Sequence, residues 1–194
     1  MKEREWVKNI VVERLQYTLD ELTRELKVVE SHKLPYTFEV RSYNNDVVFE
    51  TSNFEAYETD LLILERLSQE RWIPRVVIEC KINTVTTHDA ITYSHKASTH
   101  KNVHPYLRYG ILLGHRKHYP LPGRLFRHGA HFDFMMSWRD YVPSDVEWNE
   151  FVNVINEEIN ASRTLESIIY NSRSPRRERY HCLHRKLQLT SFDD

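Results

Sequence analysis

Apolar and polar residues alternate in short blocks along the chain, and these blocks predict a mixture of helices and strands. From Glu5 to about Val29 an apolar residue recurs every three or four positions with charges between, which is the pattern of an amphipathic helix. A second such helix is predicted after Ser144, where Ser144 and Glu147 form a capping box and an apolar stripe continues toward Ile169. Helices of this type pack one face against a sheet.

Other segments alternate with the period of two that is typical of strands, or are apolar throughout. Pro35 is expected to end the helical region, Asn44–Asp46 to form a hairpin turn and Pro74 to turn the chain into the central strand. The segments expected to form an antiparallel meander are Tyr36–Arg41, Val47–Phe49, Tyr57–Leu64 and Arg75–Ile82.

A strand–helix–strand unit is predicted to follow. Thr86 and Asp89 form a capping box for a helix that runs to about His100, and Tyr106–Gly114 is a largely apolar segment behind it. Such a unit favours parallel pairing through a right-handed crossover. With a further edge strand at His131–Trp138, the predicted fold class is α/β, with a mixed central β-sheet flanked by helices.

Composition sets the outer limits. A chain of 194 residues with 40% hydrophobic and 28% charged residues suits one soluble globular domain, predicted here over residues 1–172. The 27 basic residues nearly balance the 28 acidic ones, so binding to nucleic acid would require a local basic concentration. Residues 173–194 form a basic C-terminal extension that meets this requirement. Two cysteines and the lack of any long apolar segment lead us to expect a cytoplasmic protein that does not contact membranes.

The chemistry of the chain is concentrated in the predicted strand Arg75–Ile82. Because side chains alternate faces on a strand, Glu79 and Lys81 project on one side, and an apolar row on the other side is expected to aim them outward. Asp60 lies early in the preceding strand. Two carboxylates are a usual protein contribution to a magnesium site, and a nearby lysine can orient water and offset transition-state charge. This combination of groups suits phosphodiester hydrolysis.

These residues resemble the motif of the PD-(D/E)XK nuclease superfamily. In that motif an acid lies in one strand, an acid–x–lysine sequence ends the next strand, and a helix and another strand follow. Here the matching residues are Asp60 and Glu79-Cys80-Lys81. The resemblance covers roughly Glu13 to Gly114, and Thr59 stands where a proline often precedes the first acid. It implies a restriction-endonuclease-like fold and a magnesium-dependent DNA endonuclease that acts on double-stranded DNA and leaves a 5′-phosphate. It also implies that Asp60 and Glu79 bind Mg²⁺ and that Lys81 orients the attacking water.

The first expectation within this class is a site-specific restriction endonuclease. The alternatives are a structure-selective resolvase or repair nuclease, and a non-catalytic nucleic-acid-binding protein that keeps the fold. A surface salt bridge between neighbouring strands, with Asp60 unrelated to it, is the structural alternative.

Additional acids are candidates for the same site. Nucleases of the resembled type often place an acid on the first helix, and Glu13 is the chosen candidate, with Glu21 as an alternative. Glu50, Glu55 and Glu58 either supplement the site or act as charged groups at the sheet edge.

Contacts with nucleic acid are expected from basic residues that follow the motif. These are Lys96 and His100 on the predicted helix, Arg116, Lys117, Arg124 and Arg127 in the segment after it, and Arg176, Arg177 and Arg179 in the extension. The pairs His115 with His118 and His128 with His131 have spacings that could bind zinc, but the intervening prolines and glycine favour a loop. The apolar stripe after Ser144 could also pair with its twin in a homodimer.

Overall fold

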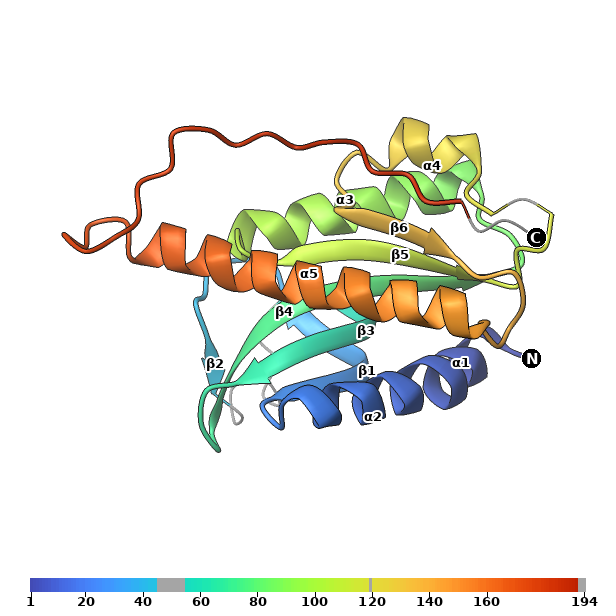
Figure 1. The fold of residues 1–194 in the computed structure, drawn as a ribbon, viewed down its shortest axis with the longest axis horizontal. Coiled ribbons are helices and arrows are strands. Elements are labelled where there is room, and N and C mark those ends of the chain that lie inside the picture. The colour runs from blue at the N-terminus through green and yellow to red at the C-terminus, as the bar shows by residue number, and fades with distance from the viewer. Residues whose placement is uncertain (45–54, 119, 192–194) are drawn as a thin grey trace.

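The computed structural model describes residues 1–44, 55–118 and 120–191, and its elements are shown in Figure 1. The helical elements are α1 (Glu3–Trp6), the π-helix η1 (Val7–Val12), α2 (Glu13–Leu22), α3 (Thr87–Val103), α4 (Gly123–His128) and α5 (Asp145–Tyr170). The strands are β1 (Leu26–Pro35), β2 (Tyr43–Asn44), β3 (Ala56–Arg66), β4 (Arg71–Ile82), β5 (Arg108–Gly114) and β6 (Phe134–Ser137).

The strands form one mixed sheet in the order β1-β3-β4-β5-β6, with β2 paired to the start of β4. β1, β3 and β4 are antiparallel neighbours, whereas β4, β5 and β6 are parallel. This arrangement confirms the α/β class, the mixed sheet, the parallel crossover through α3 and the edge position of β6.

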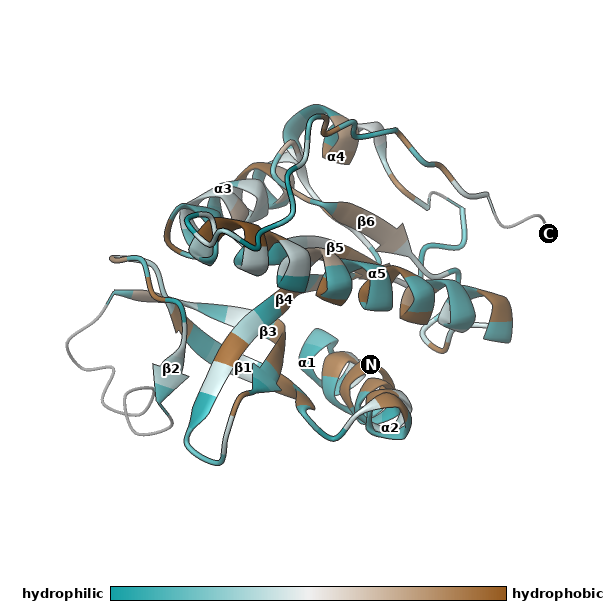
Figure 2. Ribbon diagram, turned by 60° about the vertical axis from the view of Figure 1, so that its left-hand side comes forward, coloured by the Kyte–Doolittle hydropathy of each residue, from teal (hydrophilic) through white to brown (hydrophobic). Residues whose placement is uncertain are grey.

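Helices cover both faces of the sheet (Figure 1). On one face, α1, η1, α2 and α5 pack against a row that includes Val76, Ile78 and Cys80 of β4. On the other face, α3 and α4 pack against a row that includes Val77 and Ile111. Figure 2 shows the apolar residues of β4 and β5 between these two layers. Because neither face is open to water, a charged side chain on the inner part of β4 is enclosed by the protein.

The first helical region is shorter than predicted. It ends at Leu22, and the chain enters β1 at Leu26, where the prediction continued the helix to Val29. Leu22 is itself 60% exposed, so its helical spacing does not reflect burial. Val28 and Val29 are β-branched and pair with β3, and this long-range pairing overrides the local helical pattern.

The predicted hairpin is also revised. Pro35 is the last residue of β1 rather than the end of a helix, and residues 36–42 form no strand. The turn residues 45 and 46 and the strand Val47–Phe49 lie outside the described residues. The antiparallel meander is therefore made by β1, β3 and β4.

Pro74 lies inside β4 and does not precede it. It pairs with Leu64 at a register shift in which Ile63 pairs with Val76, so Arg75 is the additional residue of a β-bulge. A proline is tolerated at such a bulge because a ladder hydrogen bond is already missing there. The buried Arg75 guanidinium pairs with Glu166 of α5 at 2.9 Å, which connects the helix to the sheet.

Both predicted capping boxes are confirmed, at Thr86 with Asp89 and at Ser144 with Glu147. After α5 the chain turns back along the outside of that helix (Figure 1), and residues 175–191 are exposed without regular secondary structure. Within the described ranges, none of the helices combines the length and the apolar character that a membrane span requires.

Candidate active site

Asp60 and Glu79 lie side by side where two strands separate. The β3–β4 pairing begins at Leu61 with Ile78, so Asp60 and Glu79 are the next residue on each strand beyond the last pair. Asp60 Oδ2 accepts a hydrogen bond from the backbone N–H of Cys80 at 2.8 Å. Asp60 therefore points to the part of β4 that carries Glu79 and Lys81, as the sequence predicts.

Glu79 is enclosed rather than aimed outward, which corrects the sequence expectation. Its side chain is fully buried, since α3 covers this face of β4. Oε1 accepts hydrogen bonds from the Tyr109 hydroxyl at 2.5 Å and from Lys96 Nζ at 2.9 Å. Oε2 is buried and has no hydrogen-bond partner among the described residues. One oxygen of this carboxylate is thus held in place, whereas the other makes no hydrogen bond in the described structure.

This environment changes the acidity of Glu79. Burial raises the pKa of its carboxyl, the charge of Lys96 opposes that rise, and the charge of Asp60 adds to it. The resulting pKa is about 7, compared with an ordinary value of 4.5. A carboxyl with this pKa is partly protonated at neutral pH and loses its proton when a cation binds.

Lys81 reaches the same region from the end of β4. Its ammonium lies 3.4 Å from Glu3 Oε1 and 5.6 Å from the centre of the Tyr93 ring. Burial lowers its pKa, but Tyr93, Glu3 and Asp89 outweigh burial and raise the pKa above its ordinary value. Lys81 is therefore a permanent positive charge at neutral pH, suited to holding an anion or a water molecule.

Lys96 brings a second ammonium to the site from α3. Besides Glu79, it donates to the backbone carbonyl of Glu58 at 3.0 Å. It lies 5.9 Å from the centre of the Tyr57 ring and 5.5 Å from that of Tyr93. Lys96 thus points into the site, at the carboxylate, and not toward the outer surface of α3.

Glu3 is the acid of the N-terminal helix that reaches the site, and sequence reasoning missed it. Its carboxylate contacts Lys81 and accepts from the Ile82 N–H at 3.4 Å. Trp6 fixes this end of the helix, because its indole N–H donates to the Tyr141 carbonyl at 2.7 Å. Its ring also lies against Gly114, where an added Cβ would come within 2.4 Å of it.

Glu13 does not join this cluster. It is exposed on α2, and ten residues separate it from Glu3, which corresponds to roughly 15 Å along a helix axis. The prediction that Glu13 is catalytic is therefore corrected in favour of Glu3. Glu21 is likewise exposed near the far end of α2, and Glu55 is exposed before β3, while Glu50 lies outside the described residues.

Unusual backbone conformations surround the site. Within the described ranges, the non-glycine residues with positive φ are Ser31, Asn83 and His115. Ser31 interrupts the β1–β3 pairing beside Asp60, between the pairs of Glu30 with Leu61 and of His32 with Thr59. Such conformations cost roughly 1–3 kcal/mol each and persist where the surrounding structure enforces them, often at functional sites.

The donor set of the site is small and consists of oxygen atoms. Asp60 and Glu79 supply carboxylates, and among the described residues there is no group of three or more His, Cys, Asp or Glu side chains that could hold a metal ion. The histidine pairs considered for zinc are therefore not gathered into such a group. Two carboxylates are nevertheless enough for magnesium, which commonly completes its shell with water and phosphate oxygens.

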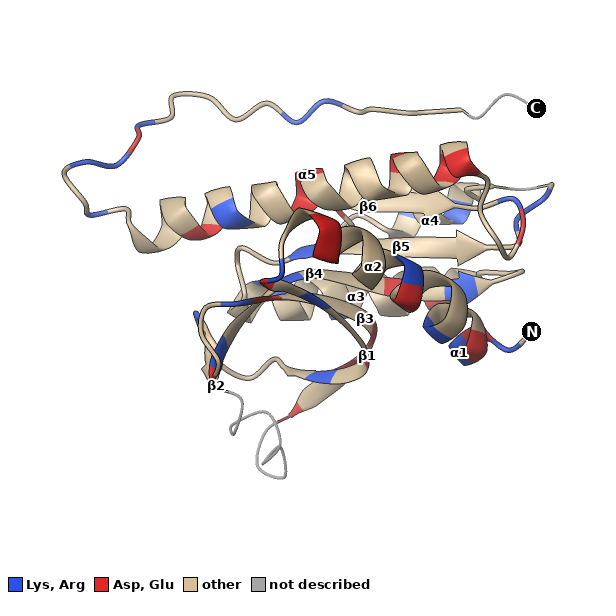
Figure 3. Cartoon of the chain, turned by 60° about the horizontal axis from the view of Figure 1, so that its bottom comes forward, with Lys and Arg blue, Asp and Glu red and all other residues tan. Residues whose placement is uncertain are grey.

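The residues predicted to contact nucleic acid are spread over the molecule. His100 is buried and its Nε2 lies 3.1 Å from the Leu34 carbonyl, so it is not accessible to nucleic acid, and that prediction is corrected. Arg116 is half-buried and contacts the Asn83 carbonyl, whereas Lys117, Arg124 and Arg127 are exposed. Lysine and arginine residues of the loop after β5 lie at the end of the molecule that holds the N-terminus (Figure 3).

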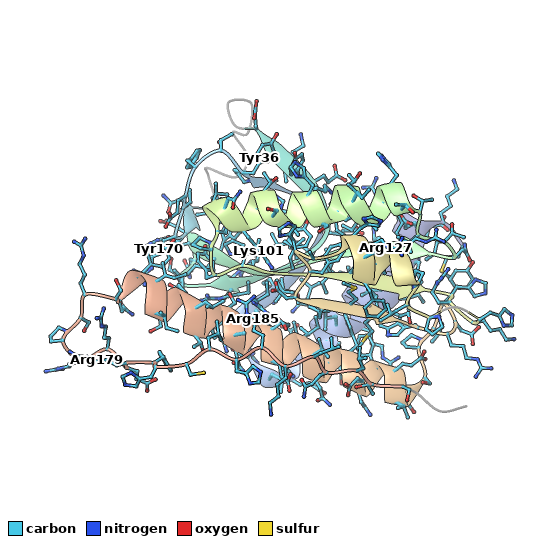
Figure 4. The ribbon with its side chains drawn as sticks, turned by 90° about the horizontal axis from the view of Figure 1, so that it is seen from above. Tyr36, Lys101, Arg127, Tyr170, Arg179 and Arg185 are labelled. Atoms are coloured by element: carbon cyan, nitrogen blue, oxygen red, sulfur yellow. The ribbon has the colours of Figure 1, made fainter. Side chains whose placement is uncertain are left out.

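The basic residues of the extension are exposed, but they do not form one cluster with those of α4. Figure 4 shows Arg179 at one end of the molecule, Arg127 on α4 far from it, and Arg185 beside α5 between the two. Arg176, Arg177 and Arg179 are all exposed to solvent.

Comparison with known proteins adds nothing to this picture. The sequence matches no family model, and a search of curated proteins gives no match. The site must be interpreted from its own geometry.

Proposed function

We propose that this protein is a magnesium-dependent endodeoxyribonuclease that hydrolyses phosphodiester bonds in double-stranded DNA. The observation that carries the proposal is the buried Glu79 carboxylate, which lies beside Asp60 and has one oxygen without a hydrogen-bond partner in the described part of the chain. An unpartnered buried carboxylate oxygen is costly unless a cation or a proton binds it. The lysines at the same site supply the positive charge that a phosphate substrate needs.

The residues present fit a magnesium ion. Asp60 and Glu79 would hold it, because both are hard oxygen donors and Glu79 Oε2 has no other partner among the described residues. When bound, magnesium would supply a water of lowered pKa and neutralise charge on the phosphate oxygens. Cation binding would also remove the need for a proton on Glu79.

The chain's own residues position the reaction. Tyr109 and Lys96 fix Oε1 of Glu79, and Glu3 and Tyr93 hold the Lys81 ammonium near the end of β4. Lys81 would orient the attacking water and offset the negative charge that develops on the phosphate in the transition state. Because α3 encloses the carboxylates, these electrostatic interactions would be stronger than they are in open solvent.

The resemblance to the PD-(D/E)XK superfamily supports the same function. The fold has the expected mixed sheet, with the first acid in β3 and the Glu-x-Lys pair at the end of β4, followed by a helix and a parallel strand. Within this class we propose a site-specific restriction endonuclease, because the described residues form one α/β domain followed by a basic extension. A structure-selective resolvase or repair nuclease is the alternative.

Cleavage assays test the proposal. Wild-type protein should nick or linearise supercoiled plasmid with Mg²⁺ and should be inactive with chelator. Discrete fragments would indicate a restriction enzyme, whereas preferential cutting of a four-way junction would indicate a resolvase. Asp60→Asn should be inactive under all these conditions while it binds DNA like the wild type, and equal cleavage by this variant would refute the assignment.

A further inference from the structure

Two neighbouring strand ends turn in an unusual way next to the candidate active site. Ile82 and Gly114 are paired at the end of the parallel β4–β5 ladder, and the residues that follow them, Asn83 and His115, have φ values of 62° and 57°. Carboxyl ends of parallel strands are common ligand-binding positions, and strained backbone often marks such sites. The two turns therefore call for a functional explanation.

Side chains hold the two turns together. His115 Nδ1 lies 2.6 Å from Asn83 Oδ1, which also accepts from the Tyr141 hydroxyl at 3.4 Å. The His115 and Tyr141 rings are stacked with their centres 4.2 Å apart. Asn83 is thus fixed by contacts from the residue that follows β5 and from the segment after β6, so its loop is preorganised.

Two guanidinium groups flank this loop. Arg116 Nη1 donates to the Asn83 carbonyl and its Nε donates to the Pro120 carbonyl at 3.4 Å, while Arg124 Nη1 donates to the Val85 carbonyl at 3.1 Å. Neither arginine forms an ion pair with a carboxylate in the described part of the chain. Burial and the charge of Arg124 both lower the pKa of Arg116. Two like charges held close together by neutral carbonyls favour an anion beside them.

The loop begins at the edge of the candidate active site. Asn83 is two residues beyond Lys81, and the intervening Ile82 N–H contacts Glu3. A ligand held by Arg116 and Arg124 would therefore lie beside the group that is to act on the scissile bond.

We propose that the loop Asn83–Val85, together with Arg116 and Arg124, binds a backbone phosphate of the DNA that flanks the bond presented to Lys81. This inference rests on the proposed function and adds a substrate-positioning site to it. Arg116 donates to the two carbonyls through Nε and Nη1, and in the proposed complex its Nη2 would donate to a phosphate oxygen. The planar fork of arginine suits phosphate better than lysine does, and contacts of this kind fix the register of the duplex.

The test measures binding without cleavage. A fluorescein-labelled duplex is titrated by anisotropy in the presence of chelator at several salt concentrations, with wild type, Arg116→Gln, Arg124→Gln and Arg116→Lys. Arg24→Gln, which removes an exposed arginine of the turn between α2 and β1, is the matched control. The slope of log affinity against log salt is negative, and loss of one phosphate contact should reduce its magnitude by about 0.9. It should also weaken binding by about three- to tenfold at 0.1 M salt.

Arg116→Gln and Arg124→Gln should show this smaller salt dependence and weaker binding. Arg116→Lys should recover part of the loss, and Arg24→Gln should bind DNA like the wild type. Slopes equal to that of the wild type would overturn the proposal, and so would tight binding of inorganic phosphate at this pair with unchanged DNA affinity. Circular dichroism of each variant excludes unfolding as the cause. If the slopes change but the wild type cleaves no DNA, the phosphate site is supported and the nuclease assignment is wrong. If the wild type cleaves DNA and the slopes are unchanged, the nuclease assignment is supported and the phosphate site is wrong.

Discussion

The Lys96 ammonium lies 2.9 Å from Oε1 of the buried Glu79 carboxylate, so a cation of the protein itself already pairs with one oxygen of the candidate metal ligand. Glu79 Oε2 remains without a partner in the described structure. Lys96 therefore keeps Glu79 closer to ionisation than burial alone would allow, and it leaves one oxygen for an external cation. Under the proposed function, this pairing would keep the carboxyl able to lose its proton when a cation binds.

Replacing Lys96 with methionine should shift the pH dependence of the site. The charge of Lys96 opposes the rise in the pKa of Glu79, so without it this pKa moves above its present value of about 7. A bound cation must displace the proton, and the acid limb of a plasmid-cleavage profile should therefore move to higher pH. Lys8→Met, at an exposed lysine, serves as the control, and an acid limb that is identical in wild type and Lys96→Met would contradict this role.

Glu79→Gln should change the pH dependence of stability. The pKa of Glu79 is raised on folding from 4.5 to about 7, so its contribution is most favourable below pH 4.5 and is lost as the pH rises through 7. The size of this shift corresponds to about 3 kcal/mol. The free energy of unfolding of Glu79→Gln, minus that of wild type, should therefore increase by about this amount between pH 4.5 and 8.

Urea unfolding followed by tryptophan fluorescence measures this difference. Glu13→Gln, at an exposed acid, is the control and should show a difference that is independent of pH. A difference for Glu79→Gln that is equally flat would show that folding does not raise the pKa of this carboxyl.

Two buried histidines, His100 in the last turn of α3 and His104 at its C-cap, should produce an opposite trend. Burial lowers the pKa of His100 and of His104 from 6.5 to about 4, so both are neutral in the folded protein at pH 7. Their contribution to stability is present in full above pH 6.5 and is lost as the pH falls toward 4, because the unfolded chain binds protons at a higher pH than the folded protein does. The full loss corresponds to about 3 kcal/mol of unfolding free energy for each residue. His104→Gln should lose less stability than wild type between pH 7 and 5 in urea titrations. Parallel losses in the two proteins would contradict the assignment.

The alternation of β4 was sufficient to place Glu79 and Lys81 on one face of the strand, and the expected pairing of β3 with β4 brought Asp60 beside Glu79. The pattern could not show that Glu79 is enclosed, since that depends on how α3 packs across the sheet. Tyr109 could not be predicted as its partner for the same reason, because the contact depends on the register of β5 on β4. These errors concern contacts between elements that are distant in sequence.

The role of Glu3 and the start of β1 were missed for the same reason, because both depend on contacts between segments that are distant in sequence. The helix end that carries Glu3 is anchored by Trp6, which packs on Gly114 and donates to the Tyr141 carbonyl, and the sequence carries no local signal for these contacts. The helical spacing of Leu22 and Leu26 predicted a continuous helix, although the β-branched pair Val28 and Val29 was a signal for a strand. Local pattern and long-range pairing disagree there, and pairing with β3 decides the outcome.

Lys81→Ala should abolish cleavage with Mg²⁺ while DNA affinity stays within a few-fold of wild type. The reason is that the ammonium is assigned to the water and the transition state rather than to substrate binding. Single-turnover cleavage and anisotropy on the same duplex separate the two effects. Normal cleavage by Lys81→Ala would show that its pairing with Glu3 is structural only.

Truncation after Asn171 should weaken DNA binding and flatten its salt dependence. Arginines of the exposed extension, including Arg176, Arg177 and Arg179, would no longer contact phosphates. Thermal stability should change little, because residues 175–191 are exposed and contribute nothing to the two hydrophobic cores. Affinity that is unchanged across ionic strength would assign the extension no role in binding.

Binding of a divalent cation by Asp60 and Glu79 is the claim on which the proposed function depends. Titration with Mn²⁺ at pH 8, followed by the electron paramagnetic resonance signal of the free ion and with Mg²⁺ as competitor, measures it directly. Wild type should bind the ion in competition with Mg²⁺, and Asp60→Asn and Glu79→Gln should each bind at least about tenfold more weakly. Equal binding by wild type and Glu79→Gln, or no binding by the wild type, would contradict the account.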